Sequence, residues 1–331
     1  MTDLTLLGPW IRRFLLEHLV SERNLSINTQ KSYRDMLLQL LPFLSKHTDK
    51  PIDRLTVTDL SADRTRLFLN QLEAARSCSP STRNQRLSGI HALARFVGER
   101  CPECIEWCHQ VRLIPFKKTI EPSIVCLDRE EMNALLAVPV RSTAQGQRDY
   151  AVLLFLYNSG ARASEAAALR VENIDWHARS VQILGKGKKL RTCPLWPATL
   201  DVLHSMVVGR DRAERVFLNR ISQPTTRSGI HALVKRCAER ACATAPSLVN
   251  KKVGPHVIRH TTASHLLRAG VDLNTIRGWL GHVSLNTTNI YAEIDLETKA
   301  RALAALTVTE EHALCEPWRN QPALMEFLRG L

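Results

Sequence analysis

The sequence predicts a mainly α-helical protein of two domains, with one small β-hairpin in the second. Its 331 residues exceed the usual length of a single domain, so two domains are expected. Apolar residues recur at helical spacing over residues 9–98 and again from 127 to about 306. Within the second stretch, only residues 180–195 show short strand-like segments around a turn.

Four short amphipathic helices are expected before residue 98, and together they form a small all-α domain. Ser26 is placed to cap the second helix, Thr58 the third and Ser79, followed by Pro80, the fourth. The predicted apolar positions are Trp10, Ile11, Phe14, Leu15 and Leu19, then Tyr33, Leu37, Leu40, Leu41 and Leu44, then Leu60, Leu67, Phe68 and Leu72, and finally Leu87, Ile90, Leu93, Ala94 and Val97. The polar faces carry a row of arginines that indicates either a solvated face or a phosphate-binding one, namely Arg64, Arg66, Arg76, Arg83, Arg86 and Arg95.

Residues 110–122 have no helical period and contain two prolines around a basic segment, which is typical of a linker. The second domain then opens with a helix that Asp128 caps. An almost wholly apolar helix follows over 148–159 and ends at Gly160. The resulting division is a helical domain over 1–109, a linker over 110–122, a second domain over 123–310 and a C-terminal extension over 311–331, with a short helix expected near 322–329.

The charge of the chain points to an anionic partner, most commonly nucleic acid. Lys and Arg number 45 against 32 Asp and Glu, which gives a formal net charge of +13 and a pI near 9.6. The excess is +6 over residues 1–120 and +10 over 121–291, whereas residues 292–331 carry −3. Because 44% of residues are hydrophobic, the chain has enough apolar material for real cores and is not expected to be disordered.

Other protein classes are not favoured. The first residues lack a basic leader followed by a clean apolar stretch, so no signal peptide is expected. The uncharged stretch over residues 150–161 is too short for a transmembrane helix, which needs roughly 18 apolar residues. Nine irregularly spaced cysteines indicate a reducing, cytoplasmic setting.

Two segments contain basic residues at positions where a hydrophobic core would be destabilised by them. In SGARASE, Arg162 opens a helix beside Glu165, an arrangement that an ordinary Arg–Glu pair would also explain. In GKGKK, Lys186 lies at the tip of the predicted hairpin, where a plain polar turn is the alternative. A P-loop is excluded because the spacing of that motif does not occur here.

Two further segments carry the remaining reactive side chains. In GPHVIRH, His256 and Arg259 share one face near a helix N-terminus, a place that suits a phosphate. A metal site at His256 and His260 is not favoured, because no acidic residue stands between them. The fourth segment runs from His282 in LGH to Tyr291. Residues 271–288 also resemble a helix-turn-helix motif.

Together, two arginines, one lysine, two histidines and one tyrosine are what a phosphoryl transfer without a metal requires. A phenol attacks phosphorus, and guanidinium groups hold the phosphate oxygens without losing their protons. A base removes the phenolic proton, whose free pKa is about 10, and an acid protonates the leaving oxygen.

On these motifs the chain resembles the tyrosine recombinases of the phage-integrase superfamily, in the style of Xer recombinases and mobile-element integrases or transposases. The resemblance rests on Arg162, Lys186, His256, Arg259, His282 and Tyr291 in family order, and on the string RHTTASHLLRAGVDLNTIRGWLGH. It covers residues 127–300 well and the N-terminal helices, including LSINTQKSYRDML, more loosely. Ser159 stands where the family more often has Thr, and the family motifs do not explain the extension after about residue 310.

The resemblance implies a four-helix, SAM-like core-binding domain and a tyrosine-recombinase catalytic domain, which form a clamp around duplex DNA at a specific recombination site. It implies that Tyr291 forms a 3′-phosphotyrosine, that Arg162 and Arg259 hold the phosphate, and that His282 donates a hydrogen bond to it. Lys186 is then the general acid and His256 the base. No metal, ATP or other cofactor is implied, and four protomers, identical or shared with a sister recombinase, are expected to act together.

Alternative functions on the same residues are a type IB topoisomerase, a catalytically silent DNA-binding regulator on the same fold, and a helix-turn-helix repressor. The hairpin and the spacing from His282 to Tyr291 favour the recombinase over the topoisomerase, and a pure DNA binder has no need of Tyr291. Separately, Cys101, Cys104, Cys108 and His109 indicate either a zinc site or buried thiols.

Overall fold

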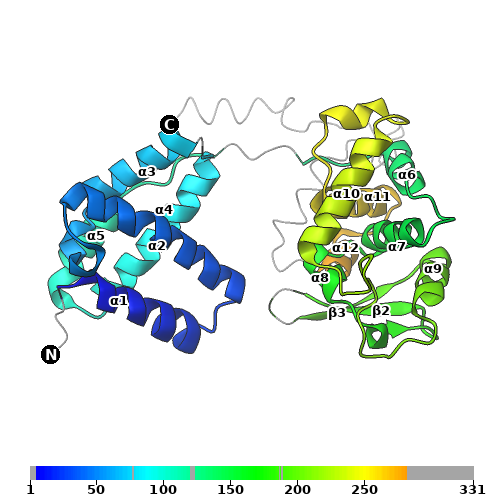
Figure 1. Ribbon diagram of the computed structural model, residues 1–331, viewed down its shortest axis with the longest axis horizontal. Coiled ribbons are helices and arrows are strands. Elements are labelled where there is room, and N and C mark those ends of the chain that lie inside the picture. The colour runs from blue at the N-terminus through cyan, green and yellow to red at the C-terminus, as the bar shows by residue number, and fades with distance from the viewer. Residues whose placement is uncertain (1–4, 77, 120–123, 186, 188, 282–331) are drawn as a thin grey trace, which may run out of the picture. The chain divides into compact units, whose positions relative to one another are not determined.

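The computed structural model describes residues 5–76, 78–119, 124–185, 187 and 189–281. The chain divides into two compact units, Met1–Pro122 and Ser123–Leu331. Both are largely helical in their described parts, and the single small sheet belongs to the second unit (Figure 1). The predicted fold class is confirmed, whereas the exact boundaries given for the domains and the linker stay predictions.

The described residues of the first unit form the four expected helices and one more. Its elements are α1 (Leu7–Arg13), the π-helical segment η1 (Phe14–Glu22), α2 (Ile27–Thr48), the short 3₁₀ turns η2 (Ile52–Arg54) and η3 (Val57–Asp59), α3 (Ala62–Arg76), α4 (Pro80–Gly98), η4 (Pro102–Cys104) and α5 (Ile105–Arg112). Two predicted caps are confirmed, because the hydroxyls of Ser26 and Ser79 accept hydrogen bonds from the main-chain N–H groups of Thr29 and Thr82.

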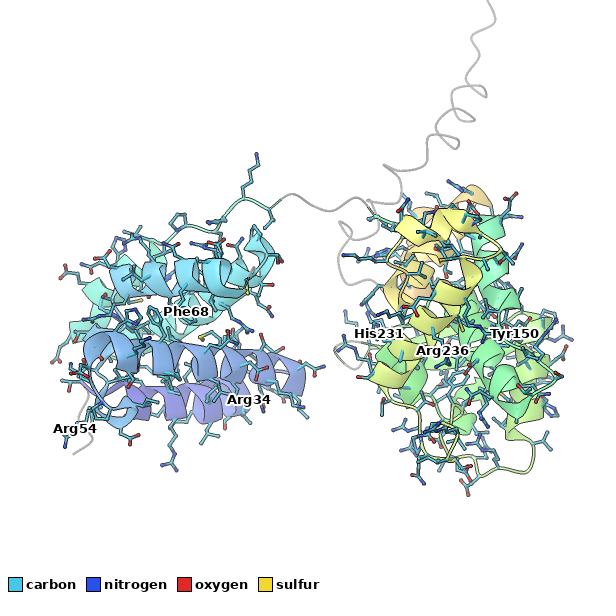
Figure 2. The ribbon with its side chains drawn as sticks, turned by 45° about the horizontal axis from the view of Figure 1, so that its top comes forward. Arg34, Arg54, Phe68, Tyr150, His231 and Arg236 are labelled. Carbon is cyan, nitrogen blue, oxygen red and sulfur yellow. The ribbon has the colours of Figure 1, made fainter. Side chains whose placement is uncertain are left out.

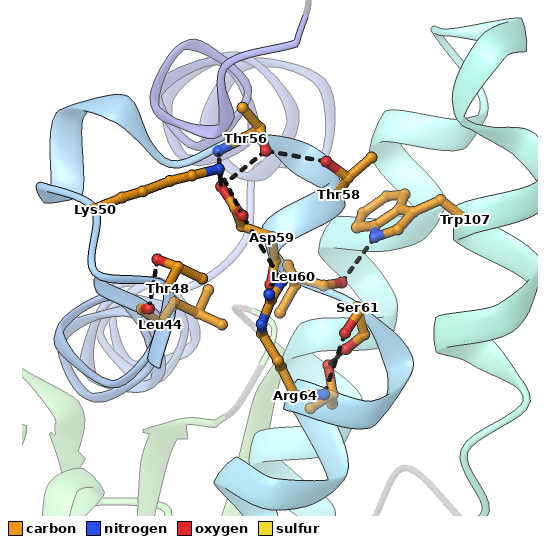
Figure 3. Close-up of polar contacts among 11 residues, drawn as sticks. Leu44, Thr48, Lys50, Thr56, Thr58, Asp59, Leu60, Ser61, Arg64 and Trp107 are labelled. Atoms are coloured by element: carbon orange, nitrogen blue, oxygen red, sulfur yellow. Dashed lines mark hydrogen bonds and ion pairs between the residues drawn. The ribbon is translucent and has the colours of Figure 1, made fainter. Parts of the chain in front are cut away.

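The prediction that Thr58 caps the third helix is wrong. Thr58 lies inside η3, and α3 begins after Ser61, whose hydroxyl accepts a hydrogen bond from the main-chain N–H of Arg64 at 3.2 Å. The cause is Asp59, whose carboxylate accepts from both the main-chain N–H and the hydroxyl of Thr56 at 2.8 Å (Figure 3). This reciprocal cap closes a separate 3₁₀ turn before the helix.

The arginine row of the first unit does not form one continuous polar face. Arg83 is buried, with 6% of its surface exposed, and its Nε lies 3.7 Å from a carboxylate oxygen of Glu73. Arg95 on the same helix is exposed and available to solvent or phosphate. Leu67, expected among the apolar positions of α3, is instead 53% exposed.

The second unit surrounds a central helix, α7 (Ala144–Ser159), which begins earlier than residue 148 because Thr143 caps it. The predicted cap at Asp128 and the end at Gly160, in the left-handed conformation, are both confirmed. The other helices are α6 (Arg129–Ala137), α8 (Ala163–Ala168), η5 (Val171–Asn173), α9 (Pro197–Val207), α10 (Arg227–Ala241), η7 (Pro246–Asn250), α11 (Pro255–Arg268) and α12 (Leu273–Leu280).

The sheet has three antiparallel strands in the order β1 (Ile174–Asp175), β2 (Ser180–Leu184) and β3 (Leu190–Pro194). The hairpin of β2 and β3 confirms the predicted strands, whereas β1 was not foreseen. The hairpin register pairs Leu184 with Leu190 and Ile183 with Arg191. Figure 1 shows this sheet at one end of the second unit.

None of the helices in the described part of the chain is long and apolar enough to cross a bilayer.

Candidate active site

Arg162 lies where α7 gives way to α8. Gly160 turns the chain with a φ of 58°, and Arg162 then takes the N-cap position of α8. Its main-chain N–H donates to Oε2 of Glu165 at 2.9 Å, and its Nη1 donates to Oε1 of the same carboxylate at 2.7 Å. The guanidinium therefore stands in a fixed place at the helix start, with 27% of the side chain exposed.

Glu165 holds two arginines at once. Its Oε2 also accepts a hydrogen bond from Nη2 of Arg191 at 2.7 Å, and only 5% of the glutamate side chain is exposed. Burial alone would raise the pKa of Glu165, but the hydrogen bond and charge of Arg191 and the hydrogen bonds from Arg162 outweigh it and hold this pKa below its usual range. The carboxylate is thus ionised and shared between two guanidinium groups.

Arg259 is the most deeply buried of the predicted site residues that the structure describes, with 3% of its surface exposed. From α11, its Nη1 donates to the main-chain oxygen of Gly160 at 2.7 Å, and its Nη2 donates to that of Leu280 at 2.6 Å. Arg259 therefore joins the end of α7 to the end of α12, the two places next to which Arg162 and His282 stand in the sequence.

His256 lies one turn before Arg259 on α11 and is exposed to solvent on one side. Desolvation lowers its pKa, and so do the positive charges of Arg259 and Arg162. Arg227 and His231 on α10 add to this effect (His231 is labelled in Figure 2). His256 is thus close to both arginines and is neutral at neutral pH, the form in which imidazole accepts a proton.

His260, the other half of the disfavoured metal pair, is half-buried one turn further along α11. Desolvation and the charges of His256 and Arg259 lower its pKa to about 4. Among the residues that the structure describes, no group of three or more His, Cys, Asp or Glu side chains is arranged to hold a metal ion.

Lys186, His282 and Tyr291 lie outside the described residues. Their immediate neighbours are described in two cases. Gly185, directly before Lys186, donates its main-chain N–H to the oxygen of Lys189 at 2.8 Å and so closes the hairpin. Gly281, directly before His282, ends α12 with a φ of 67°.

The sequence analysis did not single out Arg191, whose side chain packs against both Gly185 and Gly281. Period-two alternation along 190–194 places Arg191 on the same face of the strand as Cys193, which is fully buried. An arginine at an inward-facing strand position is unusual, and the sequence alone shows this feature. The sequence does not show which distant segments Arg191 contacts.

The cysteine cluster is mostly buried thiol. Cys101 and Cys108 are buried, and Cys108 packs against Gly98, whereas His109 is exposed. Burial, followed by a hydrogen bond with Cys101, raises the pKa of Cys104 to about 12, so this group is a protonated thiol at neutral pH. The described residues thus favour the interpretation of these cysteines as part of the packing of α4 and α5.

Comparison with protein families gives two matches in tandem. Residues 126–297 match the phage integrase family, and residues 11–100 match the phage integrase N-terminal SAM-like domain. The second of these covers the four-helix region of the first unit, and the first covers every predicted site residue.

Curated relatives extend the likeness over the whole chain. A putative integrase/recombinase, y4rC, of Sinorhizobium fredii is 36% identical over all of both chains. The tyrosine recombinase XerC of Oceanobacillus iheyensis is 32% identical over 84% of this chain and 90% of its own length. Among solved structures, the Tn1549 transposon integrase in complex with a circular intermediate DNA matches with a TM-score of 0.68 and 15% identity, over 89% of this chain and 98% of that one, which shows a shared fold.

Proposed function

The chain belongs to the phage integrase family, and from that premise we propose that it is a site-specific tyrosine recombinase, of the integrase or transposase type, that acts through a 3′-phosphotyrosine intermediate without metal or ATP. The observation that carries the proposal is that Arg259 binds the main-chain oxygen of Gly160, two residues before Arg162, and that the charges of both arginines act on His256 and lower its pKa. Two guanidinium groups beside a proton acceptor are what the attack of a phenol on a phosphodiester requires.

The proposed reaction begins with Tyr291 and the scissile phosphate. The phenolic oxygen bonds to phosphorus while the bond from phosphorus to the 5′-oxygen breaks. His256 accepts the phenolic proton, and Lys186 donates a proton to the departing 5′-oxygen. Arg162 and Arg259 neutralise the charge on the non-bridging oxygens, and His282 donates a further hydrogen bond to them.

The second half of the proposed reaction is the reverse of the first. The 5′-hydroxyl of another strand gives its proton to Lys186 and bonds to phosphorus, while the bond from phosphorus to the phenolic oxygen breaks and Tyr291 takes its proton back from His256. Because the phosphotyrosine is an ester like the bond it replaced, religation needs no external energy source. The positions of charge are the same in both directions, so one arrangement of Arg162 and Arg259 serves both.

The proposed substrate is duplex DNA at a specific site, and the proposed active form is a tetramer of identical chains or one shared with a sister recombinase. Solved relatives support the choice of DNA, since the XerH recombinase was solved bound to its difH substrate and the Tn1549 integrase with a circular intermediate. The excess of +10 over residues 121–291 supports it independently, because a basic surface favours the phosphate backbone. Residues 292–331, at −3, are proposed to contact protein rather than DNA.

The test is to trap the covalent intermediate. DNA flanking the gene is offered as nicked duplexes from which the short strand diffuses away after cleavage, so that religation fails. We expect a protein–DNA adduct that forms in EDTA without ATP, linked through the 3′ phosphate to Tyr291 as read by peptide mapping. An adduct that requires a divalent metal, or relaxation of supercoiled DNA without any strand exchange, would contradict the proposal.

A further inference from the structure

Arg191 is a buried cation on the inward face of the hairpin. It pairs with Ile183 across the strands, and only 8% of its side chain is exposed. Burying a guanidinium is costly unless charge and hydrogen bonds compensate it. The contacts that compensate the burial of Arg191 therefore indicate its structural role.

Those contacts reach two other segments of the second unit. Nη2 donates to Oε2 of Glu165 at 2.7 Å, and Nε donates to the main-chain oxygen of Trp279 at 2.9 Å. Glu165 in turn holds the main chain and the guanidinium of Arg162. One planar group thus joins the β3 strand, the start of α8 and the last turn of α12.

The guanidinium also packs tightly against two glycines. A Cβ atom on Gly185 would stand 3.3 Å from Nη1 of Arg191, and one on Gly281 would stand 3.0 Å from its Cδ. Nη1 is buried and has no hydrogen-bond partner among the described residues. In the sequence, Gly185 directly precedes Lys186 and Gly281 directly precedes His282.

We propose that Arg191 is a positioning residue for the phosphate-binding arginine Arg162. It fixes Glu165 from one side so that this carboxylate aligns Arg162 from the other, while its bond to the main-chain oxygen of Trp279 anchors its own guanidinium. The inference rests on the proposed function, because it assigns Arg191 a task in that same reaction. Arg191 itself touches neither the DNA nor the reacting atoms.

The geometry requires the fork of an arginine. Nε and Nη2 point to different partners, an amide oxygen and a carboxylate, at fixed directions in one plane. Lysine keeps the positive charge but has one nitrogen on a flexible stem, so it satisfies one partner at a time. Arg191→Lys therefore separates the charge at this position from its geometry.

The experiment measures the rate of covalent attachment to a nicked duplex at saturating DNA, and DNA affinity separately. We expect Arg191→Lys to slow attachment about 10- to 100-fold, as small misplacements of catalytic groups do, with affinity changed less than about threefold. Arg210→Lys is the matched control, because Arg210 also donates to a carboxylate and to main-chain oxygens in the second unit, those of Glu214, Val216 and Arg215. We expect its attachment rate to stay within about twofold of the original.

A double-mutant cycle separates positioning from general loss of stability. If Arg191 acts through Arg162, adding Arg191→Lys to Arg162→Lys slows the reaction little beyond Arg162→Lys alone. The inference would be overturned if the rate of the double variant were reduced by the product of the two single reductions. It would also be overturned if Arg191→Lys reacted as fast as the unaltered chain. Absence of any adduct from the unaltered chain would instead contradict the proposed function.

A folding defect is detected in the same samples. Thermal unfolding of Arg191→Lys is followed alongside that of Arg210→Lys, and rates are compared at a temperature where both are folded. If Arg191→Lys does not fold, the milder Glu165→Gln tests the same link from the other side. It keeps the size of the side chain and weakens both guanidinium contacts, and a rate within about twofold of the original would overturn the inference.

Discussion

The guanidinium of Arg259 donates from Nη1 to the main-chain oxygen of Gly160 at 2.7 Å. Gly160 adopts a φ of 58°, and a Cβ atom there would stand 2.3 Å from Cδ2 of Leu280. The end of α7, the middle of α11 and the end of α12 therefore meet with no room for a methyl group. The position of Arg259, one of the two arginines proposed to bind the phosphate, thus depends on a glycine 99 residues away in the sequence.

Replacing Gly160 tests this dependence. We expect Gly160→Ala to lower the free energy of unfolding by about 2 to 4 kcal/mol, because it adds a steric clash to an unfavourable backbone conformation. Gly209→Ala is the matched control, since Gly209 has a φ of 75° but nothing within 4 Å of its Cβ position. We expect that change to cost only about 1 kcal/mol. Equal losses in chemical denaturation would contradict the packing described.

The pH dependence of cleavage follows from His256. A base works in its neutral form, and the pKa of His256 is lowered by desolvation and by the charges of Arg259 and Arg162. The acid midpoint of the rate of covalent attachment should therefore lie below pH 6.5. A rate profile with its acid midpoint above pH 7 would exclude His256 in this environment as the base.

The stability of the second unit should fall in the same mildly acidic range. His260 has a pKa of about 4 in the folded chain against 6.5 for an ordinary histidine, so the unfolded state binds more protons between these values. The stabilisation is complete above pH 6.5 and is lost as the pH falls toward 4. A shift of this size corresponds to a loss on the order of 3 kcal/mol. Denaturant unfolding of His260→Gln at pH 7 and pH 5 should show a smaller change than the unaltered chain does.

DNA binding should weaken steeply with salt. If the basic surface neutralises at least about six phosphates, affinity falls by about a thousandfold or more between 50 and 200 mM salt. Fluorescence anisotropy of a labelled duplex across this range measures the slope. A change of less than about tenfold would argue against extensive phosphate contacts.

The helices of this protein were largely predictable because their signals are local. Ser26, Ser79 and Asp128 cap their helices through bonds to residues three positions away, and such spacing is visible in a sequence. The error at Thr58 has the opposite cause. Asp59 binds Thr56 and Lys50 to close a 3₁₀ turn, and the bond to Lys50 spans nine residues and depends on tertiary packing.

In the candidate site, too, the residues with local signals could be predicted from the sequence and those with distant partners could not. Arg162, His256 and Arg259 became candidates because basic residues stand out beside helix starts and here follow the order of a known family. The structure shows where these three side chains lie, whereas their roles stay predictions. Arg191 was not singled out because its hydrogen-bond partners, Glu165 and Trp279, are 26 and 88 residues away in the sequence. The periodicity of a sequence does not predict contacts between such distant residues. The burial of Arg83 was unforeseen for a similar reason, since its neighbour Glu73 lies on another helix.

The most direct test of the central claim is covalent trapping by Tyr291→Phe beside the unaltered chain on the same nicked duplex. Removing one hydroxyl removes the nucleophile and leaves the DNA-binding surface in place. We expect no adduct on a denaturing gel from Tyr291→Phe, with DNA affinity within about twofold of the original. An adduct that persists in this variant would show that another residue attacks the phosphate, and would contradict the mechanism proposed.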